Sequence, residues 1–290
     1  MIWLSTDAVS EADAARMLQE NASLLALTPA EAYALCPTLR PERILTALLD
    51  SSAMDIDVSG LHQGYLSELK RRKGLVVYRS PVATLRRSIG AWLVTAGEHT
   101  ISCGAVVNAA GAWADDVAER AGVPPVGLQP KLRSAFISKP QSHSALAGSA
   151  LVADTCERWY FKPEGGSVLA SPADQTESPP CDARPDELAI AQAIDSINEV
   201  TTLGLRSVLR AWAGLRTFAP DCSPVVGARP GHDGFCFLAG EGSYGIQMAP
   251  ALALVAANIV NDGTLSESVR RYGVTAEELS PDRFTTSQHA

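Results

Sequence analysis

Two apolar segments of this sequence each run through a turn of small residues into a stretch that favours a helix. Residues 105–108 lead through Ala109–Ala112 into a helix predicted over 113–121. Residues 235–239 lead through a glycine-rich turn into a helix predicted over 246–261. A strand, a tight turn and a helix in this order are typical of nucleotide-binding folds. The sequence therefore predicts an α/β (α+β) chain, part of which has a Rossmann-like form.

The second of these turns, Gly240–Gly245, satisfies the pattern G-x-G-x-x-G. A dinucleotide fingerprint also needs a second parallel strand after the helix, ending in an acidic residue for the ribose. Here Gly263 and a polar tail follow instead, which argues against a self-contained NAD site. Two interpretations remain open. The helix N-terminus holds an electron-rich group, or the glycines serve only tight packing.

The remaining segments divide into a mixed N-terminal part and a β-rich part that begins near Pro130. A strand is predicted over 1–4, and a helix over 9–21 with Ser10 as its N-cap. Further predicted helices are 28–36, 59–73 and 185–202, and predicted strands are 75–78, 82–87, 91–95, 99–103, 131–138, 158–162, 167–170, 205–218 and 223–226.

Composition excludes several classes of protein. A net charge of −8 argues against nucleic-acid binding, because nothing would offset phosphate repulsion. The six cysteines are dispersed without a C-x-x-C pair or a His/Cys cluster, so we expect no metal. The longest apolar stretch, 246–260, is too short to span a bilayer, and the N-terminus does not resemble a signal peptide. We therefore expect a cytoplasmic protein without an integral membrane segment.

Longer stretches resemble a known family. Residues 106–114, Val-Val-Asn-Ala-Ala-Gly-Ala-Trp-Ala, resemble the second nucleotide-contacting turn of the FAD-dependent D-amino-acid oxidase/glycine oxidase superfamily. Residues 211–221 and 223–227 resemble the strand that carries its substrate arginine and the turn that follows. Stretches that look most like its bacterial D-arginine dehydrogenase branch are 55–58, 160–163, 171–174 and 244–247.

The resemblance implies two domains and FAD as the cofactor. We expect residues 1–128 and 217–285 to form a discontinuous FAD-binding domain, and residues 129–216 a β-sheet-rich substrate domain. Family members begin with a strand, a G-x-G-x-x-G loop and a helix, and this opening has no counterpart here. We therefore expect an incomplete FAD-binding domain, which also lacks the carboxylate that favours a cationic D-arginine side chain.

The resemblance also implies particular site residues. Arg216 and Arg133 would bind the substrate carboxylate, because a guanidinium forms a planar, bidentate pair with it, and the Tyr160 hydroxyl would add a third donor. The alternatives are an Arg216 paired with a domain-interface carboxylate, a solvent-facing Arg133 and an ordinary core Tyr160. Residues implied to contact FAD are Val82, Ala109, Ala110, Gly111, Gly242, Ser243, Tyr244, Gly245, Ile246 and Gln247. Ser243 stands where the branch usually has glycine.

Two functions remain open. The first is an FAD-dependent dehydrogenase that takes a hydride from the α-carbon of a D-amino acid or a related amine and passes its electrons to an unidentified acceptor. The resulting imino acid would hydrolyse to a 2-oxo acid. The second is a non-catalytic remnant, or a subunit that needs a second chain to supply the nucleotide-binding unit before it binds FAD.

Overall fold

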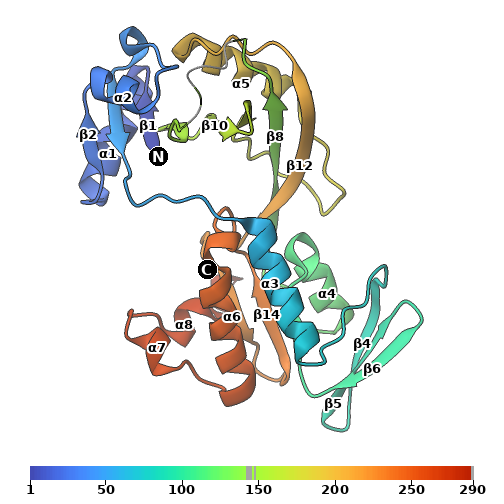
Figure 1. Cartoon of the computed structure of the whole chain (residues 1–290). Coiled ribbons are helices and arrows are strands. Elements are labelled where there is room, and N and C mark those ends of the chain that lie inside the picture. The colour runs from blue at the N-terminus through green and yellow to red at the C-terminus, as the bar shows by residue number, and fades with distance from the viewer. Residues whose placement is uncertain (142–145, 147, 289–290) are drawn as a thin grey trace. The chain divides into compact units, whose positions relative to one another are not determined.

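The computed structural model describes residues 1–141, 146 and 148–288 (Figure 1). The chain divides into two compact units. Unit 1 comprises Met1–Asp55, Leu132–Thr176 and Asp182–Gly214, and unit 2 comprises Ile56–Lys131, Glu177–Cys181 and Leu215–Ala290. Each unit is described by itself below.

Unit 1 is built on a mixed eight-stranded sheet in the order β12-β8-β11-β10-β9-β1-β3-β2. Its strands are β1 (Ile2–Ser5), β2 (Leu25–Leu27), β3 (Thr46–Leu49), β8 (Gln129–Ser138), β9 (Val152–Asp154), β10 (Tyr160–Glu164), β11 (Ser167–Ser171) and β12 (Val208–Phe218). The start of β8, through Lys131, and the end of β12, from Leu215, belong to unit 2. Three helices accompany it: α1 (Ala8–Glu20), α2 (Pro29–Leu35) and α5 (Glu187–Val200). The main core contains the fully buried Phe136, Phe161 and Ile197. Burial of these apolar side chains stabilises the sheet.

Unit 2 contains two three-stranded sheets, ordered β13-β14-β7 and β4-β5-β6. The strands are β4 (Val82–Ser88), β5 (Ala91–Ala96), β6 (His99–Cys103), β7 (Val106–Asn108), β13 (Val225–Ala228) and β14 (Phe235–Ala239). The helices are α3 (Val58–Arg71), α4 (Ala114–Arg120), α6 (Gly245–Asp262), α7 (Glu267–Arg270) and α8 (Ala276–Leu279). Strands β7 and β14 are parallel, which is the arrangement that the two strand–turn–helix segments predict.

The N-terminal segment differs from its expected place. A strand does form at β1, but it pairs with β9 in parallel and with β3 antiparallel, so residues 1–55 group with unit 1. The short strands β2, β3 and β9, and the helices α7 and α8, were not predicted. Residues 75–78 are described without a strand, contrary to the prediction.

The start of α1 also differs from the prediction. Asp7, not Ser10, is the N-cap, and its carboxylate accepts hydrogen bonds from the backbone N–H groups of Val9 and Ser10 at 3.0 and 2.8 Å. Ser10 stands at N3, where its hydroxyl accepts from the backbone N–H of Asp7 at 3.1 Å. The two residues form a reciprocal capping box, in which the carboxylate satisfies the first helical amides.

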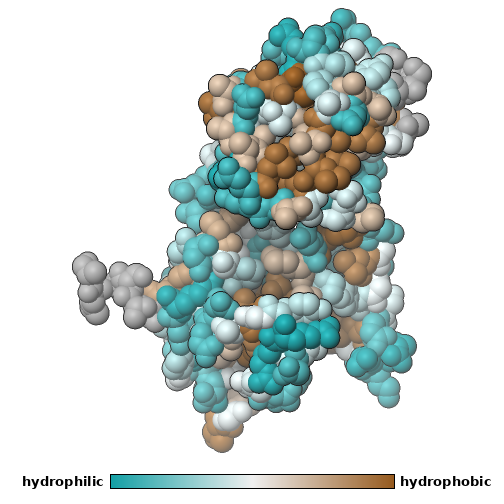
Figure 2. All heavy atoms as spheres, turned by 90° about the vertical axis from the view of Figure 1, so that its left-hand side faces the viewer, coloured by the Kyte–Doolittle hydropathy of each residue, from teal (hydrophilic) through white to brown (hydrophobic). Residues whose placement is uncertain are grey.

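The surface of unit 1 carries exposed hydrophobic residues. Figure 2 shows them gathered on the side of unit 1 where α1, α2 and β2 lie. The large ones in this part of the sequence are Val9, Leu25, Tyr33, Leu35 and Leu45. Strand β2 is the last strand of its sheet, and its residues, Leu25–Leu27, are all apolar. This free edge therefore lacks the charged residues that commonly protect edge strands. Within the part of the chain that the structure describes, no helix is long and apolar enough to cross a membrane.

Candidate cofactor and substrate site

The turn after β7 is held by hydrogen bonds of a buried side chain, and the space beside its glycine is open. The buried Asn108 accepts a hydrogen bond from the Ala110 N–H at 3.3 Å and donates one to the Ala114 carbonyl at 2.7 Å. Gly111 has φ +56°, and a Cβ placed there would meet no described atom within 4 Å. A rigid turn with a left-handed glycine and free space beside it suits close approach of a ligand to the backbone. Ala109, Ala110 and Gly111 therefore fit the expected nucleotide contact.

In the glycine-rich turn after β14, packing against the protein explains two of the glycines, unlike Gly111. Gly240 and Gly242 have φ values of +73° and +56°. A Cβ on Gly242 would lie 2.7 Å from Cε1 of Phe218, and one on Gly240 would lie 3.3 Å from Cβ of Ala219. The Gly242 N–H also donates to the Thr217 carbonyl at 2.8 Å. These glycines therefore let the turn pack on β12, as the packing interpretation predicts.

The residues after α6 do not complete a dinucleotide fingerprint. In the described part of the tail, through residue 288, α6 is followed by α7, α8 and a 3₁₀ helix over Pro281–Gln288, without a strand. The parallel strand that the fingerprint requires after its helix is thus missing from these residues.

The start of α6 can still bind an electron-rich group. Tyr244 is at the N-cap position, and no described side chain caps the first turn. The backbone N–H groups there lack intrahelical partners and lie at the positive end of the helix dipole. Tyr244, Ile246 and Gln247 are exposed, while Ser243 and Gly245 are half-buried. This turn and the one after β7 both follow the carboxyl ends of the paired parallel strands, the usual edge for a ligand in an α/β sheet.

Arg216 is placed beside this glycine-rich turn. It is half-buried on β12, and its Nη1 donates a hydrogen bond to Oγ of Ser243 at 2.9 Å. Among the described residues, its guanidinium forms no ion pair. Arg229 shows what a structural arginine looks like here. It is 5% exposed and donates to the carbonyls of Pro124 and Pro125 and to the Asp282 carboxylate.

Arg133 and Tyr160 belong to unit 1, on β8 and β10. Arg133 is only 8% exposed, so the alternative of a solvent-facing residue is wrong. The flanking Trp159 and Phe161 are buried with stacked rings 6.2 Å apart, whereas Tyr160 is half-buried, which confirms the predicted alternation. In the sheet, β11 lies between the strands that carry Arg133 and Tyr160.

Val82 begins β4 in unit 2. Its carbonyl accepts a hydrogen bond from Nη1 of Arg120 at 2.7 Å, and the pairing of β4 with β5 is irregular between Val82 and Thr84. The arginine thus fixes the backbone at the position that is expected to contact adenine.

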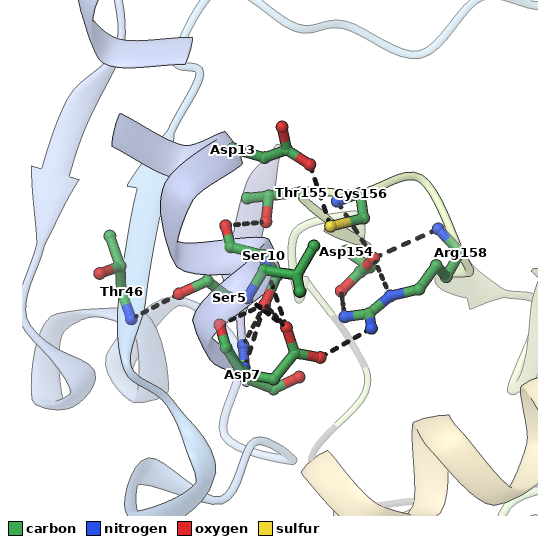
Figure 3. Close-up of polar contacts among 11 residues, drawn as sticks. Ser5, Asp7, Ser10, Asp13, Thr46, Asp154, Thr155, Cys156 and Arg158 are labelled. Atoms are coloured by element: carbon green, nitrogen blue, oxygen red, sulfur yellow. Dashed lines mark hydrogen bonds and ion pairs between the residues drawn. The ribbon is translucent and has the colours of Figure 1, made fainter. Parts of the chain in front are cut away.

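A polar network in unit 1 fixes the turn that precedes Tyr160 (Figure 3). The fully buried Asp154 accepts hydrogen bonds from Nε and Nη2 of Arg158 at 2.8 and 2.7 Å. Nη1 of the same guanidinium donates to Asp7 at 2.7 Å, and the Thr155 hydroxyl donates to the Ser10 carbonyl at 2.7 Å. The network therefore joins the start of α1 to the β9–β10 turn.

No sequence pattern reveals this network. Asp7 and Arg158 are 151 residues apart, and neither residue belongs to a recognisable pattern. The only local signal is the spacing of four residues between Asp154 and Arg158, which by itself does not distinguish a fixed turn from an exposed ion pair.

We predict that the stability of unit 1 depends on Asp7 in acid. The backbone N–H of Ser10, and then the Arg158 guanidinium, lower the pKa of Asp7 to about 2. Because an unfolded Asp titrates near about 3.9, the charged carboxylate stabilises the folded state above that pH, and this contribution is lost as the pH falls through about 2. Asp7→Asn keeps a capping side chain but removes the charge.

Urea unfolding between neutral pH and pH of about 2 measures this contribution. The wild-type midpoint is expected to fall more steeply in acid than that of Asp7→Asn. Asp195→Asn, on the exposed face of α5, is the matched control and should follow the wild type. Equal acid sensitivity of wild type and Asp7→Asn would contradict the prediction.

The sequence matches the family model described as "FAD dependent oxidoreductase" over residues 1–259. It is 33% identical over 186 residues to FAD-dependent oxidoreductase domain-containing protein 1 of Bos taurus, covering 56% of this chain and 37% of that protein. It is 24% identical over 242 residues to the mitochondrial dimethylglycine dehydrogenase of Rattus norvegicus, covering 76% of this chain and 28% of that protein. The chain thus spans about a third of the length of these curated relatives.

Solved structures resemble the fold closely. L-Proline dehydrogenase from P. horikoshii superposes with a TM-score of 0.76 at 20% identity, covering 98% of this chain and 76% of that one. Glycine oxidase from Geobacillus kaustophilus superposes with a TM-score of 0.77 at 20% identity, covering 89% of this chain and 70% of that one. These likenesses confirm the expected α/β (α+β) class.

Proposed function

Because this chain belongs to the family of FAD-dependent oxidoreductases, we propose that it oxidises D-amino acids in the manner of the bacterial D-arginine dehydrogenases. FAD is the cofactor of this family, and when bound it accepts the hydride that leaves the substrate α-carbon. The resulting imino acid hydrolyses to a 2-oxo acid. The amino-acid substrate class is supported by the names of three relatives, a proline dehydrogenase, a glycine oxidase and a dimethylglycine dehydrogenase.

The observation that carries the proposal is the partial burial of Arg216 without a carboxylate partner among the described residues. Its guanidinium is half-buried next to the start of α6 and, among the described residues, forms no ion pair. Partial burial strengthens its attraction for a carboxylate, and its planar fork orients a carboxylate through two hydrogen bonds. Arg133 and Tyr160 are the further carboxylate donors in this proposal. None of the three serves as a general base, so the contribution of the protein is orientation and charge pairing.

The FAD contacts are assigned to two backbone turns of unit 2. Ala109, Ala110 and Gly111 would lie against the nucleotide, with the Val82 backbone at the adenine. Gly242 to Gln247 would bring amide groups and the positive end of α6 to the flavin, where they stabilise the negative charge of its reduced form.

A second candidate is that the chain binds FAD only with a further polypeptide segment, supplied by a partner chain. Two observations favour it. Strand β7 is the last strand of its sheet, so one side of this parallel pair has no partner strand among the described residues. None of the residues of α3, all of which the structure describes, is buried. An open parallel edge and a helix without a covered face are what an added strand and helix would complete.

A flavin titration tests the FAD site and separates the two candidates. Gly111→Ala puts a methyl group into the open space beside the turn, and we expect it to raise the Kd for FAD at least about tenfold. Gly122→Ala is the matched control, because Gly122 also has a positive φ, +67°, and a Cβ placed there would likewise meet no described atom within 4 Å. Both variants carry the same backbone strain of about 1 kcal/mol, so only a ligand contact distinguishes them.

The outcomes are distinct. Saturable binding by the wild type, weakened by Gly111→Ala alone, supports the assigned turn and contradicts the need for a partner. Equal binding by both variants removes Gly111 from the site. No saturable binding by the folded wild-type chain favours the second candidate. Substrate class is tested separately with D- and L-amino acids and an artificial electron acceptor, and an absence of D preference overturns it.

A further inference from the structure

We propose that Ser243 is a positioning residue for Arg216, which it orients for side-on binding of a substrate carboxylate. The inference rests on the proposed function, since it concerns the same arginine. The observation behind it is the hydrogen bond of 2.9 Å from Nη1 of Arg216 to the Ser243 hydroxyl.

The Ser243 hydroxyl binds Nη1 of Arg216, and this leaves a particular edge of the guanidinium free for a carboxylate. A guanidinium offers two edges for bidentate pairing, Nε with Nη2 and Nη1 with Nη2. The Ser243 hydroxyl accepts from Nη1, and no other hydrogen bond of Arg216 to a described residue competes for the side-on edge. Nε and Nη2 therefore remain available together, and a carboxylate that uses both is held in one plane.

The hydroxyl is itself held in place relative to the arginine. Gly242 donates its N–H to the Thr217 carbonyl at 2.8 Å, and Glu241 forms a β-bridge with Phe218. Both contacts join the turn to the residues that directly follow Arg216 on β12. The close fit of Gly242 against the Phe218 ring restricts the same turn. Ser243 and Arg216 are thus parts of one fixed piece of backbone, so their hydrogen bond requires little ordering when a ligand binds.

Two substitutions at Ser243 test whether its hydroxyl orients Arg216. Ser243→Ala removes the acceptor and leaves the guanidinium free to rotate, whereas Ser243→Thr keeps a hydroxyl at the same place. Because the hydrogen bond involves a charged donor, its loss should weaken carboxylate binding at least about tenfold. Ser102→Ala, on the exposed strand β6 of the same unit, is the matched control.

The test uses the full chain with FAD added and two measurements. Titration calorimetry gives the Kd for pyruvate, a 2-oxo acid that the reaction would not consume, with methyl pyruvate as the uncharged comparison. Nitrogen-15 NMR of the arginine side chains reports rotation of the guanidinium, and the signal of Arg216 is assigned by its loss in Arg216→Lys. We expect separate Nη signals for Arg216 in wild type, Ser102→Ala and Ser243→Thr, but averaged signals and a raised pyruvate Kd in Ser243→Ala.

The results separate this inference from the proposed function. If Arg216→Lys weakens pyruvate binding and Ser243→Ala does not, the carboxylate site stands and the positioning role is overturned. If Ser243→Thr fails to restore the Kd and the Nη signals, the hydroxyl is not the active feature, and the inference is again overturned. If wild type binds pyruvate no better than methyl pyruvate, the proposed carboxylate site fails, and the inference fails with it.

Discussion

Arg216→Ala is expected to lower kcat/KM for D-amino acids by about 10³-fold. The variant loses two charged hydrogen bonds to the substrate carboxylate, each contributing about 1.5–3 kcal/mol, and tenfold in rate corresponds to about 1.4 kcal/mol. KM should rise because the carboxylate loses its partner. The kcat value should fall as well, because the α-carbon is no longer held in a reactive orientation. Steady-state kinetics with FAD and an artificial electron acceptor measure both.

Two further variants define what the arginine does. Arg216→Lys keeps the charge but not the planar fork, so its kcat/KM should lie between those of the wild type and the alanine variant. Arg210→Ala is the control on the same strand, where the exposed Arg210 guanidinium packs over Trp212 at 5.7 Å. A kcat/KM for Arg216→Ala equal to that of Arg210→Ala would remove Arg216 from the substrate site.

The parts of the site that depend on local chain geometry could be predicted from the sequence. The run of small residues after Asn108 predicts a tight turn, and Gly111 does adopt a left-handed conformation there. The alternation of Trp159, Tyr160 and Phe161 predicts which two aromatic rings face the core. Both predictions involve neighbouring residues, whose relative positions follow from φ and ψ alone.

Contacts between distant segments could not be predicted in this way. Strand β1 reads locally like any short apolar strand, and only its pairing with β9 and β3 places it in unit 1. The contact between Arg216 and Ser243 likewise depends on how the turn packs against β12. Pairing partners are selected by the whole fold, so a pattern in one segment does not reveal them.

The glycine pattern shows how one sequence can have two physical explanations. Gly240–Gly245 has the spacing of a phosphate-binding loop, yet a Cβ on Gly242 would meet Phe218 at the end of β12, and one on Gly240 would meet Ala219 directly after it. A glycine is required wherever backbone φ is positive or another group approaches, and the sequence does not say whether that group is protein or ligand. At Gly111, by contrast, no described atom occupies the space where a Cβ would lie. At Gly111, packing against the described residues therefore does not explain the glycine, and the space beside it is open to a ligand.

Asp154→Asn is expected to lower the free energy of unfolding of unit 1 by about 3 kcal/mol. Each Asp154 oxygen faces only donors: Oδ1 accepts from Arg158, and Oδ2 accepts from Arg158 and from the backbone N–H of Cys156. An asparagine replaces one oxygen with an NH₂ group, so in either orientation a donor would face a donor. The effect is large because Asp154 is fully buried, and water cannot replace the lost acceptor.

The substitution should also disturb the candidate site, because the Asp154 N–H donates to the Trp159 carbonyl directly before Tyr160. Urea unfolding followed by tryptophan fluorescence measures the loss, since Trp159 stacks on Phe161 in the core of unit 1. Asp195→Asn, which changes an exposed carboxylate in the same unit, should leave the free energy of unfolding within about 0.5 kcal/mol of wild type. If both variants unfold at the same urea concentration, Asp154 does not fix the β9–β10 turn. A loss confined to Asp154→Asn means that the ion pair of Asp154 with Arg158, and not aromatic packing alone, fixes the strand that carries Tyr160.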